Sequence, residues 1–264
     1  MNVDSNDHLR VELNDSVLTA TLSRGAVGNG MDRVLADSLL SWARQIKLGV
    51  SLDEVRVAVL RNEGFAFCVG GDLAHFTQSS DRSGELRYVA ETIHRALRLL
   101  AEGPVPVVTV VDGVAAGGGV GLALIGDIIV GTPATKFKMA YTDVGLSPDC
   151  GGSWSLTRRV GVGRALELSL TNRTVGLDEA RAIGLVGPVG GDDLEDLVSA
   201  LVGRLVNGSR GSIATTKRLT YAAAINGFSD HLDDEALSIT RLSGSRDGRE
   251  GLDAFIQKRR PDFE

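Results

Sequence analysis

The pattern of apolar positions predicts strands in the first part of the chain. The segments LRVEL and SVLTATLS alternate around Asn14-Asp15, which we interpret as a hairpin. The segments VRVAVLR and VPVVTVV instead have continuous apolar faces, and the second carries β-branched residues at nearly every position. Such runs are typical of strands that are covered on both faces, as in a parallel sheet.

Apolar residues spaced by three or four positions predict helices between and after these strands. One helix is expected over residues 31–48 and another around residues 86–100. After Gly190 no convincing strand remains, and four helical segments follow: 192–206, 211–225, 229–243 and 246–258. We therefore expect a largely parallel α/β core in residues 1–190 and a helical region in residues 191–264.

Composition and charge exclude several classes of function. Hydrophobic residues make up 43% of the chain and charged residues 23%, which is typical of a globular protein with a core. The net charge is −6 and like charges are not blocked together, so we expect neither a nucleic-acid partner nor a membrane partner. The two cysteines and four histidines show no ligand spacing, so we expect no metal site. So few cysteines predict no disulfide framework and favour the cytoplasm.

Two segments share one layout, in which a strand is followed by glycines and then by a helix. VRVAVL leads to FCVGGDL, and VPVVTVV leads to AAGGGVG. Backbone N–H groups exposed at such turns bind anions, and two of them aimed at one point form an oxyanion hole. The segments lack the lysine of a P-loop and the third glycine of a dinucleotide-binding motif. The alternative is that the glycines only allow close packing.

FCVGGDL and DGVAAGGGVGLAL resemble the two signature segments of the crotonase (enoyl-CoA hydratase/isomerase) superfamily, and the resemblance covers nearly the whole chain. It implies an α/β fold with a crotonase-like ββα-superhelix core and a C-terminal helical trimerisation region. The protein would then be a homotrimer, or a hexamer made of two trimers. The resemblance also implies an acyl-thioester substrate carried by coenzyme A, no prosthetic group, and an oxyanion hole formed by the N–H groups of Gly71 and Gly118.

Members of this superfamily differ in their acid and base groups. The resemblance implies that a hydratase holds a water molecule between two carboxylates. In this chain the two matching positions are Gly121 and Tyr141, and neither carries a carboxylate. Asp149, in the segment VGLSPDCGGSW, matches an aspartate of dienoyl-CoA isomerases, of the ring-epoxide isomerase of phenylacetate catabolism and of 4-chlorobenzoyl-CoA dehalogenase. The resemblance therefore favours an acyl-CoA double-bond isomerase in which Asp149 moves the proton.

Four alternatives to this assignment stay open. The enzyme could be a hydratase or lyase that uses Asp149 to activate water, or it could resemble the dehalogenase. The chain could also be a catalytically silent binding protein with the same fold, because both hydratase carboxylates are missing. Finally, an aspartate between a proline and two glycines is typical of a helix N-cap, with the helix starting near Cys150.

His94 and Tyr141 are further candidates for the site. His94 matches a histidine that assists the dehalogenase, although relatives of other activity resemble it there too, so a structural role is the alternative. Tyr141 is expected to line the acyl pocket or to donate a hydrogen bond, and packing in the core is the alternative. It is not expected to act as a base at neutral pH, because the ordinary pKa of tyrosine is near 10.

The resemblance also suggests how the acyl carrier is held. Arg24 and Lys258 match basic residues that contact coenzyme A in relatives, where charge-assisted bonds to phosphate are strong. Val27, Phe65 and Ala74 stand where relatives carry further basic residues. Coenzyme A is the expected carrier, and a protein-bound phosphopantetheine, which lacks the nucleotide, is the alternative.

Overall fold

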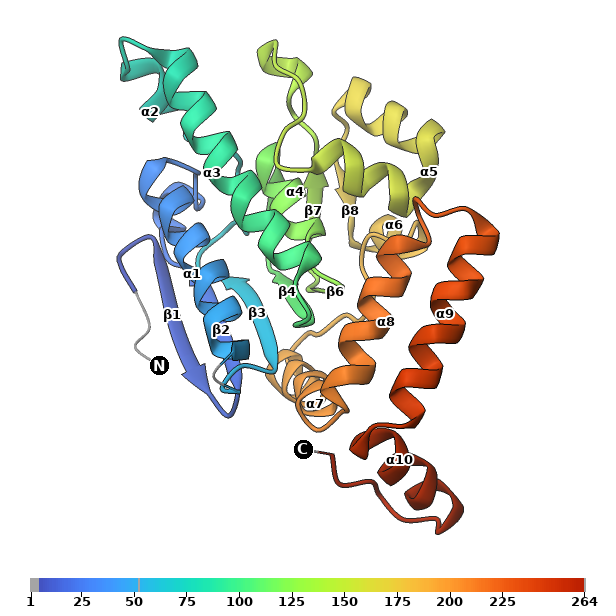
Figure 1. Cartoon of the computed structure of the whole chain (residues 1–264). Helices are drawn as coiled ribbons and strands as arrows, with labels where there is room; N and C mark the ends of the chain where they lie inside the picture. The colour runs from blue at the N-terminus through green and yellow to red at the C-terminus, as the bar shows by residue number, and fades with distance from the viewer. Residues whose placement is uncertain (1–4, 52, 264) are drawn as a thin grey trace.

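The strands of the protein form two sheets (Figure 1). Their bounds are β1 (Leu9–Asn14), β2 (Val17–Leu22), β3 (Val57–Asn62), β4 (Val107–Val111), β5 (Val114–Ala116), β6 (Ile128–Gly131), β7 (Lys136–Lys138) and β8 (Val175–Gly176). The larger sheet has the order β1-β2-β3-β4-β6, with β1 antiparallel to β2 and the other neighbours parallel. The smaller sheet has the order β5-β7-β8. The computed structural model describes residues 5–51 and 53–263. Residues 1–4 and 52 of the predicted α/β core and residue 264 of the predicted helical region lie outside the described residues.

Helices connect the strands and make up the C-terminal part of the chain. They are α1 (Arg33–Ser51), α2 (Leu73–Gln78), α3 (Arg82–Glu102), α4 (Gly118–Leu124), α5 (Gly152–Thr171), α6 (Leu177–Ala182), α7 (Leu194–Val206), α8 (Arg210–Ala222), α9 (Phe228–Ser243) and α10 (Arg246–Ile256), with short 3-10 turns η1 (Gly25–Val27) and η2 (Thr142–Val144). In the described part of the chain, none of the helices has the length and apolar character needed to cross a membrane.

The central strands are buried on both faces, as their continuous apolar pattern predicts. One face packs against α7, through the valines Val57, Val59, Val108, Val110, Val198 and Val202. The opposite face belongs to a larger cluster that includes Leu60 of β3, Leu39 of α1 and Ile93 of α3. The helices α1 and α3 lie side by side over this face (Figure 1). This burial accounts for the absence of charged side chains from β4.

The predicted elements agree with the structure except around α5. The hairpin, the parallel strands and the four C-terminal helices all form, with helix ends shifted by a few residues. Helix α5 begins at Gly152, close to the start near Cys150 that the N-cap alternative requires, and kinks at Gly161, whose φ is +78°. The first half of α5 is hidden in the sequence because its apolar residues do not share one face: Leu156 is buried whereas Trp154 is exposed. The short helices α2 and α6 were also not predicted.

Lys217 attaches the C-terminal helix α8 to the core. Its Nζ donates to the carbonyl oxygens of Leu100 (2.7 Å) and Val105 (2.9 Å) and lies 2.8 Å from Oδ2 of Asp127. The Asp127 carboxylate also accepts from the hydroxyl of Tyr221, at 3.2 Å. Asp127 therefore has a structural role. All three protons of a nearly buried ammonium group are satisfied by acceptors from two separate parts of the core.

We expect Lys217→Met to lower the free energy of unfolding by about 2–4 kcal/mol, because it removes the donor to two carbonyls and the cation paired with Asp127. Urea unfolding followed by circular dichroism measures this change. The exposed Lys47 of α1 provides the control, since Lys47→Met should change stability by less than about 0.5 kcal/mol. Equal effects of the two substitutions would contradict the role given to Lys217.

Candidate active site

Two glycine-containing loops, one after β3 and one after β4, are joined by hydrogen bonds. The N–H of Cys68 donates to the carbonyl of Val114 (3.1 Å), and the N–H of Ala116 donates back to the carbonyl of Cys68 (2.9 Å). Asn62 extends this link, because its side-chain amide donates to the carbonyl of Asp112 (3.0 Å) and accepts from the Asp112 N–H (3.2 Å). The two segments that share one sequence layout are therefore also neighbours in space.

The N–H groups of Gly71 and Gly118 take part in no hydrogen bond within the described residues. Beside Gly71, the N–H of Met31 donates to the Gly70 carbonyl (2.8 Å) and the N–H of Asp72 donates to the Met31 carbonyl (2.9 Å), a pairing that bypasses the Gly71 N–H. Gly118 is the first residue of α4, where an N–H group has no acceptor within the helix. Both glycines line the same cavity, so the structure brings the two predicted backbone donors together.

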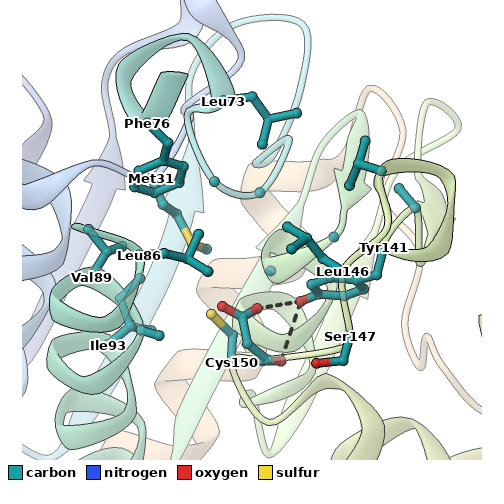
Figure 2. A pocket seen from close by; sticks show the side chains of 18 of the residues that line it. Met31, Leu73, Phe76, Leu86, Val89, Ile93, Tyr141, Leu146, Ser147 and Cys150 are labelled. Atoms are coloured by element: carbon teal, nitrogen blue, oxygen red, sulfur yellow. Dashed lines mark hydrogen bonds between the residues drawn. The ribbon is translucent and has the colours of Figure 1, made fainter. Parts of the chain in front are cut away.

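The carboxylate of Asp149 lies beside Gly118. A Cβ atom placed on Gly118 would be 3.3 Å from Oδ1 of Asp149. The hydroxyl of Tyr141 donates to the same Oδ1 at 2.5 Å and is 3.4 Å from the Asp149 carbonyl oxygen, as the dashed lines in Figure 2 show. The N-cap interpretation of Asp149 is wrong, because α5 begins at Gly152, Gly151 is the cap residue, and no side chain bonds to the cap.

Asp149 begins a tight turn of unusual backbone geometry. Its carbonyl accepts from the N–H of Gly152 at 2.8 Å, and the two residues between them, Cys150 and Gly151, have φ values of +49° and +69°, as in a type I′ turn. A cysteine held in the left-handed region costs on the order of 1 kcal/mol. The N–H of Cys150 donates to Nε2 of His94 at 3.0 Å. His94 thus contacts the turn from α3 and does not line the cavity.

The same turn fills the space beside Gly121, the first of the two positions at which the hydratases that this chain resembles carry a carboxylate. A side chain at Gly121 would overlap the carbonyl oxygen of Cys150, so α4 and the turn are in backbone contact there. The second position is held by Tyr141, which is 8% exposed and bonded to Asp149. The geometry therefore offers one carboxylate where a hydratase of the resembled type has two.

The cavity beside Asp149 has a volume of about 390 Å³, within the range of small-molecule sites. Asp149 is the only carboxylate and Arg87 the only cation among the described residues that line it. Most of its wall is apolar and comes from the segments around Gly71, α2, α3 and the loop after β7. The apolar residues labelled in Figure 2 are Met31, Leu73, Phe76, Leu86, Val89, Ile93 and Leu146, and Val69 and Val144 also line the cavity. The cavity therefore suits an apolar group whose polar end faces Asp149. Among residues 5–51 and 53–263, no three His, Cys, Asp or Glu side chains are grouped as a metal site requires.

The groups around Asp149 stay protonated at neutral pH. Burial and the nearby Asp149 charge raise the pKa of Tyr141 above its ordinary value of about 10. Burial, followed by the charge of Asp149 and a hydrogen bond to it, raises the pKa of the Cys150 thiol well above its usual range. Burial also raises the pKa of Cys68 to about 12. Tyr141 and Cys150 therefore act as donors to the carboxylate, and Asp149 is the group that can accept a proton.

Arg24 and Lys258, expected to contact the carrier, are not in the cavity wall. Arg24 is 23% exposed and donates to Oδ2 of Asp32 (2.7 Å) and to Oδ2 of Asp72 (3.4 Å), so it braces the residue that follows Gly71. Asp72 also caps α2, because its side chain accepts from the N–H of His75. Lys258 is exposed after α10, at the opposite end of the molecule from α2 (Figure 1). A single chain thus does not place either cation at the acyl cavity.

Cys150 and Met31 belong to the site although no motif predicted them. The signal for Cys150 was its position directly after Asp149, in a segment whose proline and glycines indicate a tight turn. No local signal exists for Met31, which reaches the cavity through its bridge to Gly71. A residue such as Met31 can be assigned to the site only when its tertiary pairing is known.

Comparisons with known proteins identify the family of the chain. Residues 12–264 match the model of the family described as enoyl-CoA hydratase/isomerase. The trans-2-decenoyl-[acyl-carrier-protein] isomerase of Streptococcus mutans is 30% identical over 95% of each chain. The 1,2-epoxyphenylacetyl-CoA isomerase of Escherichia coli is 34% identical over 94% of each chain. The crystal structure of an enoyl-CoA hydratase from Polaromonas, 29% identical, matches with a TM-score of 0.89 over 97% of this chain and 99% of the other.

The α/β core and the helical C-terminal region are thus shared with solved structures of proteins named as enoyl-CoA hydratases. With a family match over nearly its whole length, the chain is an enzyme that belongs to the enoyl-CoA hydratase/isomerase family, within the crotonase superfamily.

Proposed function

We propose that the protein is an acyl-CoA double-bond isomerase in which Asp149 moves a proton between two carbons of the acyl chain. The observation that carries the proposal is the single carboxylate beside two backbone donors, Gly71 and Gly118, in an otherwise apolar cavity. One carboxylate is sufficient for a proton shift, whereas the hydratases that the sequence resembles hold water between two. A carboxylate at Gly121 would collide with the turn that holds Asp149.

In this mechanism the thioester carbonyl oxygen accepts hydrogen bonds from the N–H groups of Gly71 and Gly118. These donors stabilise the negative charge that develops on the oxygen when a proton leaves the chain. Asp149 Oδ1 accepts that proton, remains beside the dienolate, and returns it two carbons along, so the double bond moves and no atom is gained or lost. Tyr141 and Cys150 keep the carboxylate oriented while it carries the proton.

The names of the relatives described above support this choice. One is named as an isomerase of a decenoyl group on acyl carrier protein and another as an isomerase of an epoxyphenylacetyl group on coenzyme A. Both names describe rearrangement of an acyl thioester rather than addition of water. A hydratase or lyase that uses Asp149 to activate water remains the alternative, and it would add oxygen to the product.

We expect Asp149→Asn to lower isomerase turnover by about 100-fold or more, because an amide cannot take up the proton. The protein is incubated in D2O with 3-enoyl-, 2-enoyl- and dienoyl-CoA, and deuterium uptake and double-bond position are followed by mass spectrometry and NMR. Asp143→Asn is the matched control, since Asp143 is half exposed and paired with Lys138 at 3.0 Å.

Near-normal turnover in Asp149→Asn would reject the shuttle. Addition of water to the double bond by the wild type would replace the isomerase with the hydratase alternative. Tight binding of the thioesters without exchange or turnover would favour the catalytically silent alternative.

We further propose that the acyl group is carried by coenzyme A. Lys258 is the cation expected to reach the nucleotide, whereas the guanidinium of Arg24 is already held by Asp32 and Asp72. Because one relative is named for a coenzyme A substrate and another for an acyl-carrier-protein substrate, the carrier has to be tested directly.

We expect a coenzyme A thioester to bind about fivefold or more tightly than the matching pantetheine thioester, and Lys258→Ala to remove most of that difference. Isothermal titration calorimetry with a saturated acyl group measures both affinities without turnover. Lys47→Ala in α1 is the control for a lost surface charge. Equal affinities of the two thioesters would transfer the proposal to protein-bound phosphopantetheine.

We also propose that copies of the chain assemble into a trimer, or into a hexamer of two trimers, through α5, α9 and α10. Large apolar side chains on these helices are exposed: Val162 (62%), Leu166 (54%), Leu170 (68%), Phe228 (79%), Leu237 (73%), Phe255 (84%) and Ile256 (77%). Figure 1 shows α9 and α10 at the outer edge of the molecule, where another copy can cover them. A neighbouring copy could then bring its Lys258 to the carrier.

Sedimentation velocity should give three or six times the mass of one chain. Phe255→Asp should shift the distribution toward smaller species, because a buried unpaired charge opposes assembly. Leu48→Asp, at an exposed position of α1, should leave the distribution unchanged. A monomer at micromolar concentration would refute the assembly.

A further inference from the structure

His94 lies behind the turn that carries Asp149. It is in the middle of α3, and its Nε2 is 3.0 Å from the N–H of Cys150. A backbone N–H can only donate, so Nε2 must present its lone pair and the ring proton must be on Nδ1. The bond therefore exists only while Nε2 of His94 carries no proton.

This bond completes the fixation of one peptide group. The peptide between Asp149 and Cys150 is planar, its carbonyl accepts from the N–H of Gly152 at 2.8 Å, and its N–H donates to His94. Hydrogen bonds on both edges prevent the plane from rotating. The direction in which the side chain of Asp149 leaves the backbone is then fixed, and Tyr141 fixes its outer end through Oδ1.

We propose that His94 is a positioning residue that holds Asp149 beside Gly118 through the N–H of Cys150, and that it does so only while Nε2 is unprotonated. The proposal rests on the proposed role of Asp149 as the proton shuttle. Protonation of Nε2 places two N–H donors against each other. The left-handed conformation of Cys150 then loses the hydrogen bond that supports it, and the turn relaxes away from Gly118.

The charged and titratable groups to consider come from the turn, from α3 itself and from the helices packed against α3. The turn and the loop before it supply Asp149, Cys150 and Tyr141, and only Asp149 among these is charged at neutral pH. Glu91 and Arg98 are about one turn away on α3 itself. The charged groups of other helices that bond to α3 are Arg33 and Asp37 of α1, His75 of α2 and Lys217 of α8. They contact Glu85, Tyr88 and Leu100, which lie about 9 Å or more from His94 along the helix. The decisive variant therefore replaces the imidazole with an acceptor that does not titrate.

Selective labelling makes the bond visible without any substrate. The chain has two cysteines, so ¹⁵N-cysteine gives two backbone amide signals. We expect the Cys150 signal of the wild type to shift as the pH is lowered through the titration of His94. It should stay in place in His94→Gln, whose side-chain oxygen accepts at every pH. The Cys68 amide, which donates to the Val114 carbonyl, is the internal control.

Turnover of the full-length protein across pH provides the second measurement. His94→Leu has no acceptor and should be slower by about tenfold at all pH values, the effect of one lost hydrogen bond to the turn. His94→Gln should keep most of the neutral-pH turnover and lose the part of the acid-side decline that His94 causes. His231→Gln makes the same chemical change on α9 and should behave as the wild type.

Two outcomes would overturn the proposal. If the Cys150 amide of the wild type does not respond to pH while that of His94→Leu is unchanged, His94 does not hold the turn. If His94→Gln is as slow as His94→Leu although its Cys150 amide signal is native, the imidazole takes part in the chemistry itself. A wild type without isomerase turnover would defeat the proposed function, and the amide signals alone would still decide whether His94 holds the turn.

Discussion

Helix α4 makes its closest contacts through its backbone. A side chain at Gly119 would overlap the carbonyl of Cys68, and a side chain at Gly121 would overlap the carbonyl of Cys150. The first contact brings the loop of Gly71 to the start of α4, and the second brings the turn of Asp149 to the same helix. Two backbone donors and one carboxylate are therefore placed by the packing of one short glycine-rich helix.

This packing also limits the chemistry available to the fold. The space beside position 121 of α4 can hold either a side chain at that position or the carbonyl of Cys150, but not both. In this structure the carbonyl occupies it. A substitution at Gly121 alone would therefore not supply a second carboxylate, because it would first displace Asp149. The path of the backbone, together with the choice of side chain, determines which acid or base the site can hold.

Much of the fold follows from local patterns, and so does part of the site. The continuous apolar run of β4 predicts burial on both faces, and the two glycine segments predict loops that expose N–H groups. Asp149 stands out because proline and glycine surround it. By contrast, the bond between His94 and Cys150 joins residues 56 positions apart, and no periodicity encodes it. For Arg24 the sequence match predicts a contact with coenzyme A. It cannot show that Asp32 and Asp72 already bind the guanidinium.

The buried thiol of Cys150 has a further consequence for a site that handles unsaturated thioesters. Such molecules are electrophiles that alkylate thiolates by conjugate addition, and Cys150 lines the cavity in which they would lie. Only the thiolate is strongly nucleophilic, and burial beside the Asp149 charge keeps the proton on sulfur. In the proposed isomerase, the arrangement that orients the carboxylate would thus also prevent the substrate from alkylating Cys150.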